Sequence, residues 1–390
     1  MATTAPPPPP PAELQADQAA ARGDAATARR LLEDASRTTP ERAETWLKLA
    51  AMCRASGDVN AALDAIAGAL RIDPLAFVPL LMKANLLDAA GRKAEAGEAY
   101  GNALAQRPSP APGHLSNAIA QAEARHAEHL QAAAARLAKA AAAREAELPE
   151  AEARRAARFR SNILRTTRVF HSEPTHFHYP GLAEREFHDR EDFPWLGTLE
   201  AATDAIAADF ERVMAAERSE LVPYIQYPED VPLRQWAALN QSKAWTAIHL
   251  LQNGERVEAN ARHCEATMAV LARLDQPDIA RRSPNAMFSL LAPGTHIPPH
   301  VGVSNARLVC HLPLIVPEGC WFRVGAERRA WNRGEAFVFD DTIEHEAMNP
   351  SQALRVVFII DTWHPGLSKG ERAAVRAIME ASDGGEGEGI

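Results

Sequence analysis

The chain has 390 residues with a formal net charge of −9, and 46% of its residues are hydrophobic. This length predicts two to three domains with a substantial core, and the acidic balance argues against a protein that mainly grips nucleic-acid phosphates or an anionic membrane surface. The charge is divided unevenly, because residues 1–170 carry +3 and the remaining 220 carry −12. Eleven of the 14 histidines also follow residue 170. Since histidine is the commonest protein metal ligand, we expect the chemistry in the second part.

The four cysteines, Cys53, Cys264, Cys310 and Cys320, show neither zinc-type spacing nor disulfide density, which favours a reducing compartment. The N-terminus lacks the charged and apolar regions of a signal peptide, and no stretch approaches 18 uninterrupted apolar residues. We therefore expect a cytoplasmic chain with no membrane span and no nucleic-acid partner.

Residues 1–12 are rich in proline and are expected to form a disordered tail. From residue 13 to 112 the chain repeats with a period of 34 residues. Glycine allows a turn between two helices, small alanines let helices approach closely, and proline ends the second helix. The pattern resembles the tetratricopeptide repeat, a helix-turn-helix solenoid whose concave face holds a peptide or partner; chance similarity among alanine-rich helices is the alternative. The positions in phase are Gly23, Gly57 and Gly91; Ala28, Ala62 and Ala96; Ala35, Ala69 and Ala103; and Pro40, Pro74 and Pro108.

Residues 113–168 are expected to form a helical connector that caps the open apolar face of the last repeat. The stretch from Glu152 to Arg168 contains six arginines, which invites a nucleic-acid interpretation. Alanine and phenylalanine interleave with the arginines at helical spacing and no aromatic stacking platform accompanies them. We therefore favour a solvated helix face.

Residues 169–368 are predicted to form a second domain, followed at 369–390 by a short helix and a disordered acidic, glycine-rich tail. Helices are expected at 198–216 and 255–274, and strands at 286–292, 307–316, 320–324, 335–340 and 354–361. The last strand is apolar on both alternating faces, which is typical of a strand buried on both sides. Arg355 is an isolated cation within it, and because burying an unpaired guanidinium is costly, it should meet an anion.

Dinucleotide-binding, P-loop and GxSxG motifs are missing, and polar residues cluster on the predicted strands and at their ends. His300 and His345, 45 residues apart and each beside a strand end, could converge on one metal. Arg355 could hold a carboxylate ligand of that metal through its bidentate fork. A histidine on a strand is more often structural, so spacing alone leaves both interpretations open. The cluster comprises Ser289, His296, His300, Arg307, His311, Asp340, Asp341, His345, Arg355 and Asp361.

Segments 296–312, 339–346 and 355–365, together with Tyr179-Pro-Gly-Leu and Phe193-Pro-Trp-Leu, resemble the aspartyl/asparaginyl β-hydroxylase family over residues 176–368. That family is a branch of the Fe(II)- and 2-oxoglutarate-dependent dioxygenases, and some members carry an N-terminal tetratricopeptide region. The resemblance implies a multidomain fold, with an all-α tetratricopeptide-type solenoid followed by an α+β domain on a double-stranded β-helix (jelly-roll, cupin-like) core.

The resemblance also implies roles for individual residues. His300 and His345 would bind Fe(II), and Arg355, helped by Ser289, would hold the distal carboxylate of 2-oxoglutarate. His311 and Arg307 would contact this cosubstrate, with O2 as the second cosubstrate. Trp245 and Arg307 would lie near the substrate, as would the Asn253-Gly254 pair, although a core tryptophan is the alternative for Trp245.

Two positions depart from what the wider group of oxygenases or the family leads us to expect. Gly302 stands where most such oxygenases carry the carboxylate ligand two residues after the first histidine, and water or another residue would fill that place. Val309 stands where a second basic side chain is expected, two residues after Arg307. Asp340 and Asp341, before His345, either orient a ligand histidine or cap a solvated turn.

The expected function is hydroxylation of a C–H bond, with release of succinate and CO2, at the β-carbon of an aspartyl or asparaginyl residue in a peptide or protein recruited by the repeats. One alternative keeps the chemistry and changes the substrate to a lipid acyl chain or a free small molecule. Another is a catalytically silent repeat scaffold whose β-domain only binds a ligand.

Overall fold

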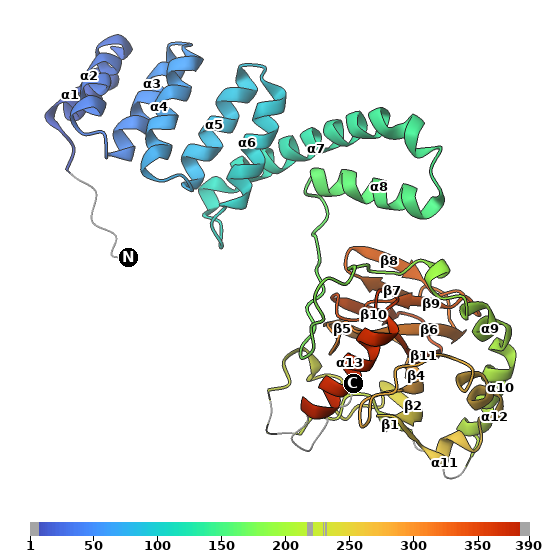
Figure 1. Cartoon of the computed structure of the whole chain (residues 1–390). Helices are drawn as coiled ribbons and strands as arrows, with labels where there is room; N and C mark the ends of the chain where they lie inside the picture. Colours follow the sequence, from blue (N-terminus) through green and yellow to red (C-terminus); the bar gives the residue numbers. More distant parts are fainter. Residues whose placement is uncertain (1–7, 217–220, 229, 231, 383–390) are drawn as a thin grey trace. The chain divides into compact units, whose positions relative to one another are not determined.

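The computed structural model describes residues 8–216, 221–228, 230 and 232–382. The chain divides into two compact units, Met1–Thr166 and Thr167–Ile390. Figure 1 shows a helical first unit and a second unit in which strands predominate.

The first unit begins with three helical hairpins, which give a tetratricopeptide-like region at the predicted 34-residue spacing. The glycines after the first helix of each hairpin adopt positive φ, at 82° for Gly23, 76° for Gly57 and 74° for Gly91, so each can close the turn that ends that helix. The alanines predicted to allow close approach are buried, with Ala28 and Ala62 fully so. The hairpins are α1 (Pro11–Ala21) with α2 (Ala25–Thr38), α3 (Ala43–Ala55) with α4 (Val59–Ile72), and α5 (Phe77–Ala89) with α6 (Lys93–Ala105).

A buried carboxylate ties the first hairpin to the second. Glu13 in α1 is 0% exposed and accepts hydrogen bonds from Arg42 Nε at 2.9 Å and Lys48 Nζ at 2.9 Å. Thr45 Oγ1 donates to the same carboxylate at 2.5 Å. These partners hold the pKa of Glu13 at about 2, against the effect of burial, which by itself would raise it. The α1 helix begins at Pro11, so the predicted tail is two residues too long; residues 1–7 lie outside the described part.

The connector consists of η1 (Gly113–Leu115), α7 (Ser116–Glu145) and α8 (Glu150–Ile163). α7 packs on α6, where Gly97 and Gly101 leave room for the rings of His129 and His126. The arginine-rich α8 has no buried residue, in agreement with a solvated face. No helix in the described ranges is both long and apolar enough to cross a bilayer.

The second unit contains two antiparallel sheets. The larger has the order β1-β2-β4-β11-β6-β9, with β3 paired to β2, and the smaller has the order β5-β10-β7-β8. Side chains from both sheets meet in one apolar cluster, which includes Met287 and Val357 from the larger sheet and Phe322 and Ala347 from the smaller. The strands are β1 (Val222–Pro223), β2 (Trp245–Gln252), β3 (Glu255–Arg256), β4 (Ala286–Leu291), β5 (Thr295–His300), β6 (Arg307–Ile315), β7 (Trp321–Val324), β8 (Glu327–Ala330), β9 (Phe337–Phe339), β10 (His345–Asn349) and β11 (Arg355–Trp363).

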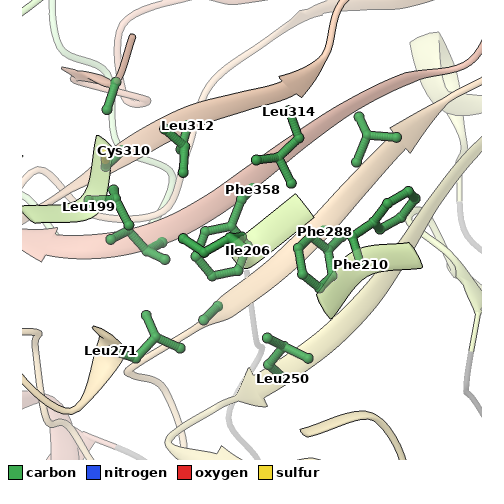
Figure 2. Packing of buried hydrophobic residues seen from close by; sticks show 14 of the residues in the cluster. Leu199, Ile206, Phe210, Leu250, Leu271, Phe288, Cys310, Leu312, Leu314 and Phe358 are labelled. Carbon is green, nitrogen blue, oxygen red and sulfur yellow. The ribbon is translucent and has the colours of Figure 1, made fainter. Parts of the chain in front are cut away.

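Helices cover the other face of the larger sheet, as Figure 2 shows. Phe288 of β4 and Phe358 of β11 have ring centroids 5.1 Å apart, and Phe210 of the helix α10 lies 5.3 Å from Phe288. Alternate residues of each strand therefore face either this helix-covered core or the smaller sheet. The helices of this unit are η2 (Arg190–Asp192), α9 (Leu196–Ala201), α10 (Thr203–Met214), η3 (Arg234–Trp236), α11 (Glu258–Ala261), α12 (Glu265–Leu271) and α13 (Lys369–Ser382).

The structure corrects both predicted helices of this unit. The expected helix 198–216 is broken at Ala202, where the Thr203 hydroxyl donates to the carbonyl of Glu200 at 2.6 Å. The expected helix 255–274 begins instead as strand β3 and continues as two short helices. Its start was misjudged because Asn253 and Gly254, at φ 53° and 85°, form a hairpin turn that returns the chain along β2. The tail 383–390 lies outside the described residues.

Candidate active site

A cavity of about 730 Å³ lies between the two sheets. Three odd-numbered residues of β6, Arg307, Val309 and His311, line it, because they lie on the face opposite the helix-covered core. The structure brings Trp245, Ser289, His300, Arg307, His311, His345 and Arg355, the residues implied by the resemblance, to this one cavity. Asn253 and Gly254 do not line it and form the β2–β3 turn instead.

His300 and His345 lie side by side on neighbouring strands of the smaller sheet. They are register partners in the β5–β10 pair, with ring centroids 4.0 Å apart. His300 Nδ1 lies 2.8 Å from the carbonyl of Pro298, and His345 Nδ1 lies 3.1 Å from the carbonyl of Ile343. A carbonyl only accepts, so each Nδ1 carries the proton and each Nε2 keeps a free lone pair.

Burial keeps both rings neutral. It lowers the pKa of His345 to about 4 and, with the neighbouring His345, lowers the pKa of His300 well below its usual value. Two neutral imidazoles with free Nε2 lone pairs side by side are suited to a divalent metal, and the backbone carbonyls fix their orientation. Among the described residues, no third histidine, cysteine, aspartate or glutamate completes a metal-type cluster with them.

Gly302 has no space for a side chain because the Asp341 carboxylate occupies that place. A Cβ at position 302 would lie 2.7 Å from Asp341 Oδ1 and nearer still to the other carboxylate atoms. Asp341 Oδ2 accepts from Arg307 Nη2 at 3.3 Å, whereas Oδ1 is buried without a partner in the described part of the chain. A carboxylate oxygen with free lone pairs is thus held beside Gly302, and it comes from the turn between β9 and β10.

The neighbouring Asp340 caps a turn, but this turn is buried and not solvated as the second alternative expected, since Asp340 is 2% exposed and Thr342 is 0% exposed. Its Oδ1 accepts from the backbone N–H and the hydroxyl of Thr342, so it caps the turn before β10. Burial raises the pKa of Asp340 to about 7. The partners that orient the His345 ring are backbone carbonyls, those of Ile343 and Asp341.

Arg355 lies in this cavity with no carboxylate partner among the residues that the structure describes. It is 2% exposed, and its Nε has no partner among the described residues. Nη1 donates to the carbonyl and hydroxyl oxygens of Ser289 at 3.3 and 3.4 Å, and the guanidinium lies 4.9 Å from the Trp331 ring centroid. Burial lowers the pKa of Arg355 to about 10, which still leaves it charged at neutral pH.

Two further donors lie beside Arg355. Ser289 Oγ accepts from both Arg355 and Trp245 Nε1, the latter at 3.1 Å, so its own proton is available to a ligand. His311 Nδ1 accepts from Trp331 Nε1 at 3.4 Å, and burial lowers the pKa of His311 well below its usual value. A neutral ring that accepts at Nδ1 carries its proton on Nε2. Guanidinium, hydroxyl and imidazole N–H donors therefore surround one place suited to an anion.

Arg307 differs from Arg355 because both ends of its guanidinium are already paired. Nη1 donates to Asp361 Oδ1 and Nη2 to Asp341 Oδ2, each at 3.3 Å. Burial alone would lower the pKa of Arg307, but the charges of Asp341 and Asp361 raise it. Ser283 and Asn285 anchor Asp361 in turn. In this structure Arg307 positions carboxylates.

Aromatic side chains that line the cavity beside His300 were not predicted from the sequence. The ring of Tyr224 stacks on Trp245 with centroids 3.8 Å apart, and Trp236 lies 5.0 Å from His300. Tyr224 and Trp236 come from β1 and η3, short elements that show no periodic pattern. The pairing of β1 with β2 brings Tyr224 to the cavity.

Part of this chain is similar to proteins of a known family. The family described as Aspartyl/Asparaginyl beta-hydroxylase matches residues 200–365. The aspartyl/asparaginyl beta-hydroxylase of Mus musculus is 32% identical over 186 residues, which is 47% of this chain and 25% of that protein. The ornithine lipid ester-linked acyl 2-hydroxylase of Rhizobium tropici is 33% identical over 197 residues, 50% of this chain and 66% of that protein.

This chain thus spans about a quarter of the length of the mouse relative and of its Homo sapiens counterpart. Among solved structures, the Yersinia enterocolitica chaperone SycD in complex with a peptide of the translocator YopD is similar to part of this chain. The match covers 30% of this chain and 88% of the SycD chain, with a TM-score of 0.28 and 14% identity. The match to the TPR2B domain of yeast Sti1 covers 30% of this chain and 94% of the Sti1 chain, with a TM-score of 0.28 and 20% identity. The family match falls on the sheet-rich unit that holds His300, His345 and Arg355. Over residues 200–365, the chain is therefore similar to the aspartyl/asparaginyl beta-hydroxylase family.

Proposed function

We propose that the second unit is an Fe(II)- and 2-oxoglutarate-dependent dioxygenase that hydroxylates a substrate C–H bond and releases succinate and CO2. The observation that carries the proposal is Arg355, a buried guanidinium without a carboxylate partner in the described chain, in the same cavity as two metal-suited histidines. A buried unpaired charge is costly, so the site favours an anionic ligand that also reaches the histidines. A dicarboxylate with a metal-chelating end meets both requirements.

His300 and His345 would hold the iron through Nε2, since their Nδ1 atoms are committed to backbone carbonyls. The bound iron and 2-oxoglutarate would supply the oxidising chemistry, which couples decarboxylation of the cosubstrate to hydroxylation. Asp341 takes the place that a side chain at 302 would otherwise occupy, and its charge is paired with Arg307. Burial raises the pKa of that carboxyl, and the charge of Arg307 opposes this effect and fixes the position of the group.

Arg355, Ser289 and His311 would bind the distal carboxylate of 2-oxoglutarate with charge-assisted hydrogen bonds. Trp331 packs against the guanidinium and Trp245 fixes the Ser289 hydroxyl, so these donors are oriented before the ligand arrives. Burial of Arg355 and His311 excludes water from this end of the cavity. We also propose that the two sheets form a double-stranded β-helix.

The substrate expected from the resemblance is an aspartyl or asparaginyl side chain of a peptide, which the helical repeats would recruit. A chaperone in complex with a peptide is among the solved structures similar to part of this chain. A second candidate, a lipid acyl chain, is favoured by one specific observation. Val309 places an apolar side chain on the cavity-facing side of β6, between Arg307 and His311.

The test is anaerobic loading of the full chain with Fe(II) and 2-oxoglutarate, followed by addition of O2. The chelate should give its weak visible charge-transfer band, and O2 should release succinate even without substrate. His300→Ala should abolish both signals. His296→Ala is the matched control, because His296 lies on the same strand, is bonded to Glu346 and does not line the cavity. A silent scaffold predicts no succinate under any condition, and an intact band in His300→Ala would refute the assigned site.

A further inference from the structure

His300 and His345 reach the cavity from strands that are held in different ways. β10, which carries His345, is paired on both sides, with β5 and with β7. β5, which carries His300, is an edge strand, and its register opposite β10 shifts between Ile297 and His300. Pro298 and Pro299 occupy this interval and have no backbone N–H to donate. The strand pairing is therefore weakest directly beside His300.

The hydrogen bond of the His300 ring does not compensate for this weakness. Nδ1 donates to the carbonyl of Pro298, which is two residues earlier on the same strand, at 2.8 Å. This bond fixes the ring relative to β5 but does not fix β5 relative to the rest of the cavity. The ring of His345, in contrast, packs against Phe322 and Phe339, with centroids 5.9 and 5.5 Å away. The position of His300 therefore depends more on contacts from outside its own sheet.

Trp236 supplies such a contact. It belongs to η3, which contacts β5, and it lines the cavity with its ring centroid 5.0 Å from that of His300, in an edge-to-face arrangement at 67°. Trp245 lies farther away, at 6.2 Å, and its indole is already engaged with Ser289 and the ring of Tyr224. An edge-to-face aromatic pair contributes about 0.5–1.5 kcal/mol beyond the area it buries.

The segment that carries Trp236 is closed at its base. A backbone bridge pairs Ile225 with Asn240. The side chain of Asn240 accepts from the N–H of Tyr227 at 2.8 Å and donates to the carbonyl of Tyr227 at 3.0 Å. The carbonyl of Trp236 accepts from the N–H groups of Leu239 and Asn240 at 2.9 and 2.8 Å. Trp236 therefore rests on a hydrogen-bonded base that does not depend on β5.

We propose that Trp236 is a positioning residue, whose indole holds the His300 ring in the orientation in which that ring binds the metal. An indole N–H only donates, so Trp236 supplies no ligand atom and acts through His300. The inference rests on the proposed function, because it takes His300 as a metal ligand. Removal of the indole should weaken metal binding, and because Trp236 is only half-buried, the second unit should remain folded.

The test is a titration of the full chain with Co(II) in the presence of 2-oxoglutarate and without O2, so that no turnover occurs. The visible absorption bands of Co(II) report both its affinity and its ligand set. Trp236→Ala should weaken Co(II) binding about tenfold or more, as the loss of a group that orients a metal ligand does. Trp236→Phe keeps an aromatic pair with His300 and should bind Co(II) within about threefold of the native chain. Asn240→Ala opens the base of the segment, outside the described lining of the cavity, and should also weaken Co(II) binding.

Trp321→Ala is the matched control. Trp321 lies 6.2 Å from His296, a histidine on the same strand as His300, and outside the described lining of the cavity. This variant should keep the native Co(II) affinity and spectrum. Far-UV circular dichroism and the melting temperature show whether each variant is folded.

A folded Trp236→Ala variant that binds Co(II) as tightly as the native chain overturns the inference and leaves the proposed function standing. An equal loss of affinity in Trp321→Ala, or a loss in Trp236→Phe as large as that in Trp236→Ala, also overturns it. If Trp236→Ala does not fold, Asn240→Ala decides: weakened Co(II) binding supports the inference, and native binding overturns it. A native chain that does not bind Co(II), or a His300→Ala variant that binds it equally well, refutes the proposed metal site and the inference with it.

Discussion

Replacing Gly302 with alanine tests whether the Asp341 carboxylate really fills the place of a side chain at 302. The added Cβ would lie 2.7 Å from Asp341 Oδ1 and nearer to the rest of the carboxylate, well inside van der Waals contact. Overpacking of this kind in a buried site costs about 1–3 kcal/mol. Gly302 does not have a positive φ, so the cost comes from the contact and not from backbone strain.

Asp341→Ala removes one of the two carboxylates that neutralise Arg307 and should cost about 2–3 kcal/mol. In the double variant, the alanine at 302 occupies the space that the carboxylate vacates. The double variant should therefore be more stable than the sum of the single effects by about 1–3 kcal/mol.

Urea unfolding followed by tryptophan fluorescence measures this coupling, because all the tryptophans except Trp46 belong to the second unit. The control is Asp340→Ala, one residue away, whose carboxylate caps a turn and should show additive behaviour with Gly302→Ala. Additivity of Gly302→Ala and Asp341→Ala within about 0.5 kcal/mol would refute the placement of the carboxylate.

Three other variants test charges at separate places. Burial lowers the pKa of Arg355 to about 10, so its charged state costs roughly 3 kcal/mol in the folded protein. Arg355→Met should therefore raise the melting temperature of the ligand-free protein, and it should abolish stabilisation by 2-oxoglutarate in a thermal shift assay. A lower melting temperature would contradict this reasoning. His188 is neutral in the folded protein because burial lowers its pKa to about 3, whereas in the unfolded chain it gains a proton below pH 6.5. The stability of the protein should therefore fall as pH drops from about 6.5 toward 3. His188→Phe should recover about 2 kcal/mol of this stability at pH 5 relative to pH 8, and equal pH profiles of the variant and the native chain would count against the prediction. Glu13→Gln should destabilise the helical unit by about 2–3 kcal/mol, as followed by far-UV circular dichroism, because it removes the buried charge that Arg42 and Lys48 share. The exposed-pair control Asp17→Asn should change stability by less than about 0.5 kcal/mol, and equal effects would refute the role of burial.

The features that sequence reasoning predicted well are those set by local pattern. The 34-residue period predicted the helical hairpins because a glycine in the turn and a small alanine at the crossing recur at fixed offsets, as at Gly57 and Ala62. The continuous apolar run at 354–361 predicted a strand buried on both faces, and every residue of β11 is buried. The same apolar run singled out Arg355, because a charged side chain within a buried apolar strand needs an anionic partner.

The strands that carry the two histidines were not predicted. β5 contains Pro298 and Pro299, which cannot donate to a ladder, and it forms because it is an edge strand with an irregular register opposite β10. β10 is polar in sequence and is specified by its neighbours β5 and β7 on either side. Both strands depend on pairing between segments far apart in the chain, which local composition does not encode.

The position of Asp341 was also beyond local reasoning. The missing carboxylate at Gly302 was visible, and so was an aspartate before His345, but nothing in their spacing indicated that one fills the space of the other. That relation arises where the chain enters β10 and passes the residues that follow β5, a contact made by the Gly302 N–H and the Asp341 carbonyl at 2.7 Å. The sequence predicted the residue types, and the fold supplied their adjacency.

The alternation along β4, β6 and β11 gives the three strands a shared parity. Even-numbered residues such as Phe288, Cys310 and Phe358 lie in the helix-covered core, and odd-numbered residues such as Ser289 and His311 line the cavity. Substrate preference can therefore be redesigned at odd positions while the even positions keep the sheet attached to its helices. A one-residue insertion or deletion within any of these strands would exchange the two sets, placing polar groups in the core and leucines in the site. Point substitutions are thus the tolerated route by which this scaffold can change its chemistry, and length changes belong in its loops.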